Sequence, residues 1–493
     1  MKRIHLLGCL LGIVLLCLGL AAASGGDAES LTLTGGDIQS LAELSTYPSL
    51  KTLTLIDCPA LDLTPLQDCS RLTSLRIAWS EGYAGGGLYD LTPLAQCARL
   101  NTLALVGHGI GDIAVLPDIP KLSALTVEKT AVGDYSPIAK LKLKHLRLYG
   151  ADADAVANIF SAVGRGLTSA SVGGCTLTPE ANAAVLSSSR LASLRFEDAE
   201  GIDGESDRWA KFKYLTSLSV TGGSVSSLEL CEPYVSTVGV KMTDVSIGGA
   251  VCSVDFDKYF LKAADVPEAA LLQLVQGSGR RWQYAVVQNH GDPYSPAVAE
   301  AFAGVSGLLS LDIQALSSDA FTMEAWKGFS KLEQLKLSDC PTVSLDILAE
   351  MPGLLRLSVQ NAAIQDAEQI AGLRKLTQLS LAGCTADSWS FLDSLGDTKL
   401  SLLSLADCDG PTAIAFVKDL PKLKVLVLET VPVTDIAPLT GLSIESLSLY
   451  GCDIADYAPL QTLQSLKRLY CSEGAALPGL SCRVVYRPAI AAE

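Results

Sequence analysis

The chain has 493 residues and a formal net charge of −16 at pH 7, with 49% hydrophobic but only 6% aromatic residues. This acidity disfavours nucleic acids and anionic membrane surfaces as partners, because both are negatively charged themselves. The sequence has only four histidines and contains no H-E-x-x-H, C-x-x-C or G-x-S-x-G motif. We therefore expect no enzyme activity, no catalytic or metal site and no cofactor.

The N-terminus has the composition of an export signal. Met1-Lys2-Arg3 is basic, residues 6–20 are almost wholly apolar, and Ala21-Ala22-Ala23 is a run of small residues. This order is typical of a secretory signal peptide. We predict a signal peptide over residues 1–23 and a protein that is secreted or held at the cell envelope or surface. An uncleaved anchor is the alternative, since the apolar run approaches the roughly 18 residues of a membrane span. No membrane span is expected in the mature chain.

One apolar pattern recurs along most of the sequence. It is clearest at Ile444-x-x-Leu447-x-Leu449-x-x-Cys452, and it restarts at Leu466, 22 residues later. A period of 20–29 residues headed by L-x-x-L-x-L is the signature of a leucine-rich repeat. A single repeat cannot bury its own leucines, so neighbouring repeats must stack. The predicted fold is an α/β leucine-rich repeat solenoid, a horseshoe with a parallel concave β-sheet and a convex side of turns, 3₁₀ segments and a few short helices.

The spacing of the repeats defines the predicted domains. We predict N-terminal repeats over residues 24–224, C-terminal repeats over 308–479, and a cap and tail over 480–493, with a terminal strand at 480–486. Two repeats carry helices, at 154–163 and 179–187. The N-terminal copies begin at Ala28, Leu50, Leu72, Leu100, Leu122, Leu143, Leu167, Leu191 and Leu215, and the C-terminal copies at Leu332, Leu354, Leu376, Leu400, Leu423, Ile444 and Leu466.

The register degrades between residues 225 and 307. This segment is either a set of irregular repeats within one continuous solenoid or a junction between two arrays, and we favour continuity. The pattern predicts strands at 235–240, 251–256 and 282–287 and helices at 267–276 and 297–305.

A turn motif accompanies the strand pattern. Asp-x-x-Pro-Leu occurs at Asp62–Leu66, Asp90–Leu94, Asp435–Leu439 and Asp456–Leu460. With this turn, the repeats resemble those of bacterial leucine-rich repeat proteins of the internalin type. The resemblance covers most of residues 28–470. It implies a secreted or surface protein that binds partners through its concave sheet, and it does not fix the partner.

The ninth repeat position departs from that family. The family commonly has Asn there, whereas this chain places cysteines. We expect these thiols to point inward as small apolar fillers with a weak donor, and to be mostly free. The exception is a possible disulfide between Cys471 and Cys482 that would fasten the terminal cap, the alternative being two further core thiols. The ninth-position cysteines are Cys58, Cys175, Cys340, Cys384, Cys408 and Cys452.

The candidate partner-binding site lies near the third strand. The step after Leu72 is 28 residues instead of 22, so six residues are inserted within 80–89. Exposed Trp, Tyr and Arg commonly dominate binding energy. The alternative is that Trp79 packs against the loop as a filler and that the charged residues are only a solvated strand face. The predicted site consists of Arg76, Trp79, Tyr83 and Tyr89, with Glu128, Arg147, Tyr149, Arg195 and Glu197 on nearby strands.

A second, less concentrated set of candidates lies on the later strands. It comprises Arg356, Gln378, Tyr450, Arg468 and Tyr470. Together these features predict an exported non-enzymatic protein that binds an unidentified protein partner through its concave face. The alternative is a carbohydrate-binding surface protein, because aromatic rings beside hydroxyl and amide groups can also stack on sugars.

Overall fold

The computed structural model describes residues 28–35, 38–85, 87–234, 238–276, 281–475 and 477–487. The predicted signal peptide and the last six residues of the predicted tail lie outside this part of the chain. The chain divides into two compact units. The first unit runs to Pro233 and adds Met242–Ser246, and the second comprises Tyr234–Lys241 and Ile247–Glu493. The division falls within the segment where the sequence register degrades.

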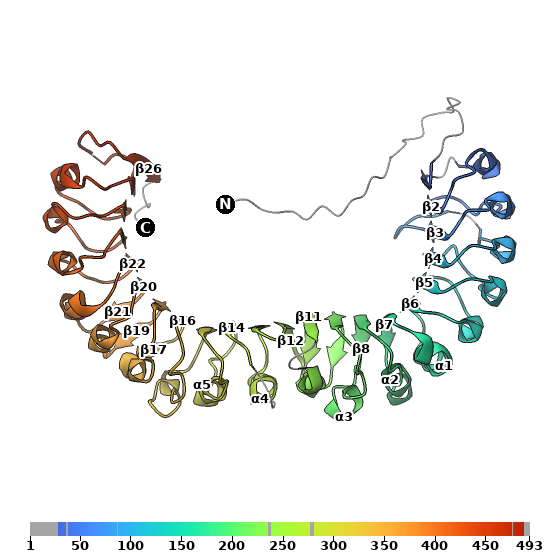
Figure 1. Ribbon diagram of the computed structural model, residues 1–493, viewed down its shortest axis with the longest axis horizontal. Coiled ribbons are helices and arrows are strands. Elements are labelled where there is room, and N and C mark those ends of the chain that lie inside the picture. The colour runs from blue at the N-terminus through green and yellow to red at the C-terminus, as the bar shows by residue number, and fades with distance from the viewer. Residues whose placement is uncertain are drawn as a thin grey trace. The chain divides into compact units, whose positions relative to one another are not determined.

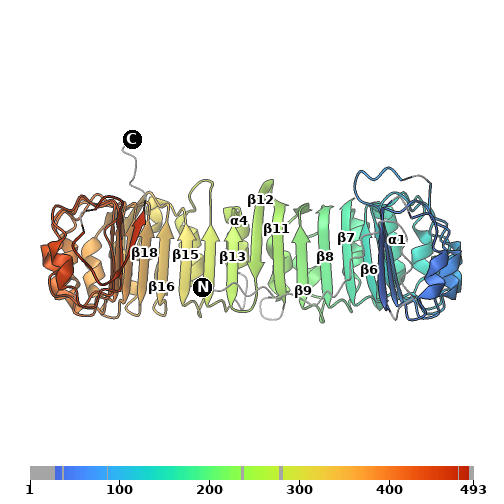
Figure 2. The same ribbon diagram turned by 90° about the horizontal axis from the view of Figure 1, so that it is seen from above.

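The first unit is built on a parallel sheet that follows chain order. Strands β1 to β9 pair successively and in parallel, and β6, β7 and β8 lie side by side in Figure 2. The strands are β1 (Ser30–Thr34), β2 (Thr52–Ile56), β3 (Ser74–Ala78), β4 (Thr102–Val106), β5 (Ala124–Glu128), β6 (His145–Tyr149), β7 (Ser169–Thr176), β8 (Ser193–Glu200) and β9 (Ser217–Thr221), followed by β10 (Ser224–Val225).

The return segments of the first unit cover one face of this sheet (Figure 1). Most of them are short 3₁₀ turns, and the predicted helices at 154–163 and 179–187 are confirmed as α1 and α2. The helical segments are η1 (Ala42–Thr46), η2 (Thr64–Asp68), η3 (Thr92–Gln96), η4 (Leu116–Asp118), η5 (Ser136–Lys140), α1 (Ala153–Val163), η6 (Gly164–Gly166), α2 (Pro179–Leu186), α3 (Ser206–Trp209) and η7 (Leu228–Tyr234).

The second unit repeats this architecture from β13 onward, with parallel pairing to the terminal strand β26. Its strands are β12 (Ala250–Phe256), β13 (Phe260–Ala264), β14 (Tyr284–Gln288), β15 (Ser310–Gln314), β16 (Gln334–Ser338), β18 (Arg356–Gln360), β20 (Gln378–Ala382), β22 (Leu402–Ala406), β23 (Val425–Glu429), β24 (Ser446–Ser448), β25 (Arg468–Ser472) and β26 (Arg483–Arg487).

Helical segments and a second small sheet complete this unit. The predicted helices at 267–276 and 297–305 are confirmed as α4 and α5. The small parallel sheet is formed by β17 (Thr342–Ser344), β19 (Ala363–Gln365) and β21 (Thr385–Ala386). The helical segments are α4 (Glu268–Gln276), α5 (Pro296–Ala303), η8 (Ser318–Ala320), η9 (Leu345–Glu350), η10 (Ala367–Gly372), η11 (Ser390–Asp397), η12 (Ala415–Asp419), η13 (Ala437–Leu439) and η14 (Ala458–Thr462).

The strand leucines stack in register, which explains why the repeats fold together. Leu53 of β2 pairs with Leu75 of β3, and Leu55 pairs with Ile77. All four side chains are buried, with exposed fractions of at most 1%. Each repeat therefore closes the core of the one before it, and the predicted leucine-rich repeat fold is confirmed within each unit. The uncovered side of each sheet, which carries the side chains between these leucines, is called the open face below.

The Asp-x-x-Pro-Leu turns begin the 3₁₀ segments. The Asp62 carboxylate accepts a hydrogen bond from the Thr64 backbone N–H at 2.9 Å, and Asp456 does the same for Ala458 at 2.8 Å. Hydrogen bonding to Thr64 also holds the pKa of Asp62 below its ordinary value. The proline that follows needs no hydrogen-bond partner for its nitrogen and has φ already suited to the turn. These aspartates therefore bind the local backbone and fix the start of each turn.

The irregular segment contains a reversal that the sequence pattern did not predict. The predicted strands at 251–256 and 282–287 are present as β12 and β14, and part of the one at 235–240 lies in β11 (Gly239–Ile247). β12, however, runs antiparallel to β13. It follows the two-glycine turn Gly248-Gly249, both with positive φ, which favours a tight hairpin connection. The expectation that this strand belongs to an ordinary repeat with a short return was wrong.

The ninth-position cysteines replace Asn as expected. Cys58 donates to the carbonyl of Leu33 in the preceding repeat at 3.7 Å, and Cys384 donates to that of Val359 at 3.4 Å. Cys175 is half-buried and the other five are buried. These thiols therefore fill the core as predicted, and those of Cys58 and Cys384 also bond weakly to the preceding repeat.

The disulfide expected between Cys471 and Cys482 is absent, and both residues are free thiols. Cys471 is buried in the last core layer, where burial and the nearby Cys482 raise the pKa of its thiol. In register it pairs with Tyr486 of β26. Backbone pairing between β25 and β26, not a covalent link, fastens the terminal strand.

Candidate functional site

The aromatic residues at and beside the 80–89 insertion pack against one another and against the repeat before it. Trp79 is only 5% exposed and Tyr89 only 3%. The indole Nε1 of Trp79 donates to the carbonyl of Cys58 at 2.6 Å, and the Tyr89 hydroxyl donates to the same oxygen at 3.3 Å. Tyr83 packs edge-on against Trp79 with ring centroids 5.3 Å apart. The expectation that Trp79 and Tyr89 are exposed was wrong, and the filler alternative describes Trp79.

The eighth repeat position explains why Trp79 turns inward. In other repeats the residue at this position follows the strand in the left-handed region, as at Asp57 (φ 52°), Asp339 (φ 55°) and Asn361 (φ 52°). Asp, Asn and Gly tolerate this conformation best, and a bulky aromatic residue does not. Trp79 occupies the eighth position of its repeat, so the usual turn is replaced by the insertion and the indole packs into the space beneath it.

The charged candidates of the first unit form a hydrogen-bonded group on the open face, here called the Arg147 cluster: Glu128, Arg147, Arg195 and Glu197. Arg147 Nε donates to Glu128 Oε2 at 3.0 Å, and its two Nη atoms donate to the Glu197 carboxylate at 2.6 and 2.7 Å. Arg195 Nη1 lies 3.4 Å from Glu197 Oε1. Strands β5, β6 and β8 thus bring together four of the predicted residues.

Burial makes this cluster more than a surface ion pair. The Arg147 side chain is 29% exposed, and those of Glu128 and Glu197 are 23% and 20% exposed. Hydrogen bonding to Arg147 holds the pKa of Glu197 below its ordinary value, and the same bonds raise the pKa of Arg147. Both groups are therefore charged across the physiological range. A guanidinium held by three bonds to two carboxylates has a fixed orientation.

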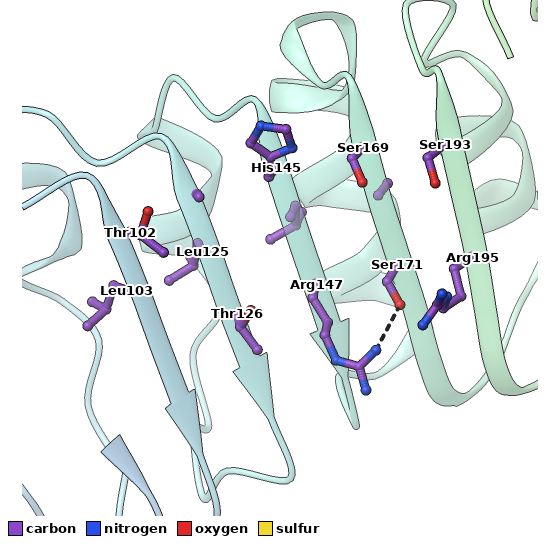
Figure 3. A pocket seen from close by; sticks show the side chains of 13 residues that line it. Thr102, Leu103, Leu125, Thr126, His145, Arg147, Ser169, Ser171, Ser193 and Arg195 are labelled. Carbon is purple, nitrogen blue, oxygen red and sulfur yellow. Dashed lines mark hydrogen bonds between the residues drawn. The ribbon is translucent and has the colours of Figure 1, made fainter. Parts of the chain in front are cut away.

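A shallow hollow of about 280 Å³ lies beside the cluster (Figure 3). Arg147 and Arg195 extend toward β7 from either side, and Arg147 donates to Ser171 Oγ at 3.4 Å. The lining offers five hydroxyl groups, two guanidinium groups and one imidazole, and no carboxylate. The lining residues are Thr102, Leu103, Ala124, Leu125, Thr126, His145, Leu146, Arg147, Ser169, Ala170, Ser171, Ser193 and Arg195.

Tyr149 closes one side of the cluster. Its hydroxyl donates to Asp198 Oδ2 at 2.8 Å, and Lys129 Nζ lies 5.8 Å from its ring centroid. The hydrogen bond to Asp198, together with partial burial, raises the pKa of Tyr149 to about 12. Asp198 was not predicted from the sequence. The signal that could have found it is its place at the eighth repeat position, where a carboxylate at the strand end reaches the neighbouring strands.

Arg76 and Tyr83 stand apart from this group. Arg76 is exposed on β3 and pairs in register with Thr54 and Ala104, and it does not itself line the hollow. Across the described ranges of the chain, its side chain makes no hydrogen bond or ion pair with another residue. Of the nine predicted site residues, the structure therefore gathers five: Glu128, Arg147, Tyr149, Arg195 and Glu197.

The second set of candidates is divided in the same way. Arg356 and Arg468 are exposed and Gln378 is half-buried on separate strands of the second unit. Tyr450 and Tyr470 instead share one neighbour, because the Arg487 guanidinium lies 5.4 and 5.3 Å from their ring centroids.

The described residues offer neither a metal-binding cluster nor a membrane-spanning helix. Within them, no three His, Cys, Asp or Glu side chains are placed to hold a metal ion. None of the helices there has the length and apolar character needed to cross a membrane.

No known family model matches the chain, and no curated protein matches it. Solved structures do match. An internalin of Listeria monocytogenes is 15% identical, with 90% of this chain and 86% of that one covered and a TM-score of 0.25. A leucine-rich repeat protein of Leptospira interrogans is 14% identical, with coverage of 88% and 93% and a TM-score of 0.40. The chain is similar to the internalins.

A plant receptor is also among the matching structures. It is the leucine-rich repeat ectodomain of a membrane receptor kinase of Arabidopsis thaliana, in complex with Casparian strip integrity factor 2. Its identity to this chain is 13%, and the TM-score is 0.36. The match covers 90% of this chain and 64% of the ectodomain chain.

Proposed function

We propose that the protein is an exported, non-enzymatic binding protein that engages a protein partner through the open face of its first unit. The Arg147 cluster and the adjoining hollow carry this proposal. Arginine is among the residues that most often dominate binding energy. Here its position is set before any partner arrives, so little side-chain entropy remains to be lost on binding. Export rests on the predicted signal peptide.

The lining of the hollow favours a particular kind of partner surface. Arg195 has a side chain that is 57% exposed, and its ion-pair contact to Glu197 is at 3.4 Å. The hydroxyl groups around it can donate as well as accept, and the carboxylates of the cluster bind Arg147 and do not line the hollow. We therefore expect the partner to present hydrogen-bond acceptors, such as backbone carbonyls or carboxylates, to this face.

A carbohydrate ligand is the second candidate. The five hydroxyl groups in the lining favour it, since a sugar offers several neighbouring hydroxyls that such a surface can match. The buried position of Trp79 removes the aromatic platform on which the sequence-based version of this hypothesis relied. Any sugar specificity would then depend on hydrogen bonds at the hollow.

The test is affinity capture from envelope and host-cell extracts with residues 24–493, beside an Arg147→Ala/Arg195→Ala variant that is checked for folding by circular dichroism. Arg71→Ala is the matched control, because Arg71 is exposed in the segment before β3, outside the hollow. We expect the double variant to lose about 30-fold or more in affinity for the captured protein, the equivalent of about 2 kcal/mol at a hot spot.

Equal capture by parent and double variant would overturn the site. Arg76→Ala, run in parallel, decides whether the interface extends to β3. Retardation of the parent in polysaccharide gels, lost in the double variant, would favour the carbohydrate candidate instead.

A further inference from the structure

The terminal strand of the second unit places one arginine in a site built by three earlier strands. The Arg487 guanidinium lies 5.4 Å from the Tyr450 ring centroid and 5.3 Å from that of Tyr470. Its Nη1 also lies 3.2 Å from both carboxylate oxygens of Glu429. These contacts are made on the open face, after β24 and along β23 and β25. The group of Glu429, Ser448, Tyr450 and Tyr470 is called the tyrosine site below.

The chemistry of this site matches a guanidinium group. A planar cation is attracted to the negatively charged face of an aromatic ring, and two rings offer two such faces. The carboxylate of Glu429 supplies the counter-charge and hydrogen-bond acceptors. Ser448 Oγ donates to Glu429 Oε1 at 2.5 Å, which fixes the orientation of that carboxylate. Arginine stacks on aromatic rings and bonds to carboxylates through its planar fork, whereas lysine offers a point charge.

The occupant is weakly anchored. β26 pairs with β25 on one side and has no other strand pairing among the described residues. Arg483 and Tyr486 are exposed, and Val484 and Val485 are only half-buried. Arg483 also stands directly opposite Arg468 in the register. Like charges placed opposite each other destabilise strand pairing. The Arg487 contacts therefore add to the backbone pairing with β25 that holds this strand in place.

We propose that the tyrosine site is an arginine-binding subsite, which Arg487 occupies in the free protein and which an arginine side chain of a basic partner segment takes over on binding. The net charge of −16 favours such a partner, because a strongly acidic protein attracts basic segments at long range. This site belongs to the second unit and does not depend on the Arg147 cluster. Either proposal can fail without the other.

The test uses the full chain and N-acetyl-arginine methylamide as the probe, with binding followed by NMR titration. In the wild type Arg487 competes with the probe, so the apparent dissociation constant is raised by the inverse of the fraction of empty site. We expect Arg487→Ala to bind the probe at least about 10-fold more tightly than the wild type. Adding Tyr470→Ala to that variant should abolish the gain.

Two controls separate recognition from loosening of the strand. Arg483→Ala removes the same residue type from β26 but away from the tyrosine site, so it should leave probe binding as in the wild type. The corresponding citrulline probe keeps the shape and loses the charge, and it should bind the Arg487→Ala variant at least about 10-fold more weakly than the arginine probe.

The proposal is overturned if Arg487→Ala and Arg483→Ala bind the arginine probe equally well. It is also overturned if the citrulline probe binds the Arg487→Ala variant as tightly as the arginine probe does. If β26 detaches in Arg487→Ala, Glu429→Gln in the Arg487→Ala background still decides the question. That exchange removes the counter-charge alone and should weaken arginine binding.

Discussion

The Arg147 cluster and the tyrosine site use the same pairing of arginine with glutamate, yet they hold their arginines differently. Arg147 is on β6, which pairs with β5 and β7, and two carboxylates bind it. Arg487 is on β26, which pairs only with β25 within the described residues, and it has one carboxylate and two aromatic rings. We infer from this comparison that an arginine on a strand paired on both sides is fixed in place, whereas an arginine on a terminal strand is a replaceable occupant of its site.

The largest expected effect is that of Arg147→Ala. It leaves Glu128 and Glu197 partly buried without their counter-charge, which we expect to cost about 2 kcal/mol, between the values for exposed and fully buried pairs. Local amide hydrogen exchange over β5–β8 measures this change. Arg195→Ala is the control and should cost at most about 0.5 kcal/mol, because its side chain is 57% exposed. Equal losses of stability in Arg147→Ala and Arg195→Ala would contradict the fixed arrangement of Arg147 between its two carboxylates.

Acid should weaken the Arg147 cluster. The pKa of Glu197 is lowered from its ordinary value of 4.5, chiefly by Arg147. A carboxylate with a depressed folded pKa contributes stability above its unfolded pKa, and loses it as the pH falls through the folded value. The stability difference between wild type and Arg147→Met should therefore be full at neutral pH and shrink below about pH 4.5. A difference that stays constant down to pH 3 would show that Glu197 is not the titrating partner.

Arg487→Ala should have a smaller and more local effect. The Arg487 side chain is 43% exposed, so its ion pair and ring contacts together should contribute only about 0.5–1 kcal/mol. We expect faster amide exchange in β26 and unchanged exchange in β20 and β22. A spread of the effect through those strands would mean that β26 is an integral cap and would remove the contrast with Arg147.

The smallest effect concerns the edge of the Arg147 cluster. The bond to Asp198 contributes most to the raised pKa of Tyr149, about 12. Asp198→Asn removes the negative charge that opposes ionisation of the phenol, so the pKa should fall toward the ordinary value of 10. Difference ultraviolet absorbance between the variant and wild type during alkaline titration measures the shift. No shift would mean that Asp198 does not receive the hydroxyl proton.

The repeats were predictable because their signal is a spacing. L-x-x-L-x-L sets which side chains point inward, and the inward residues Leu53 and Leu75 are in register as that pattern requires. The 3₁₀ turns were predictable from Asp and Pro at fixed offsets, as at Asp62 and Asp456. The helices α1, α2, α4 and α5 were found because their apolar positions change to helical spacing.

The orientation of Trp79 and the reversal at β12 were missed for a different reason. Both occur where the repeat changes length, so the repeat period alone did not give their direction, and local signals were needed. Trp79 continues the inward alternation of Leu75 and Ile77, so the strand parity itself favoured burial. Treating it as an exposed hot spot gave residue type more weight than position. The two glycines before β12 were the available sign of a hairpin.

The Arg147 cluster was predicted only in part, because the strand pattern gives the face on which a side chain lies but not its contacts. Glu128, Arg147 and Arg195 were recognised as strand residues between leucines, which places them on the open face. Their actual contacts depend on side-chain reach across strands, as with Arg147 and Glu197, which are 50 positions apart in the sequence. Arg487 was missed as the neighbour of Tyr450 and Tyr470 because its strand lies beyond the last recognisable repeat.

The ninth-position cysteines give the fold a built-in chemical reporter. Burial raises the pKa of Cys175 and Cys340 to about 11, so at neutral pH these thiols are almost entirely protonated and hence poor nucleophiles. An alkylating reagent can reach the fully buried members, such as Cys340, only when the surrounding repeat opens. Because such thiols recur along both units, the rate of alkylation at each one reads out the opening of its own repeat. The array thereby reports its local unfolding repeat by repeat, with no need to introduce a cysteine.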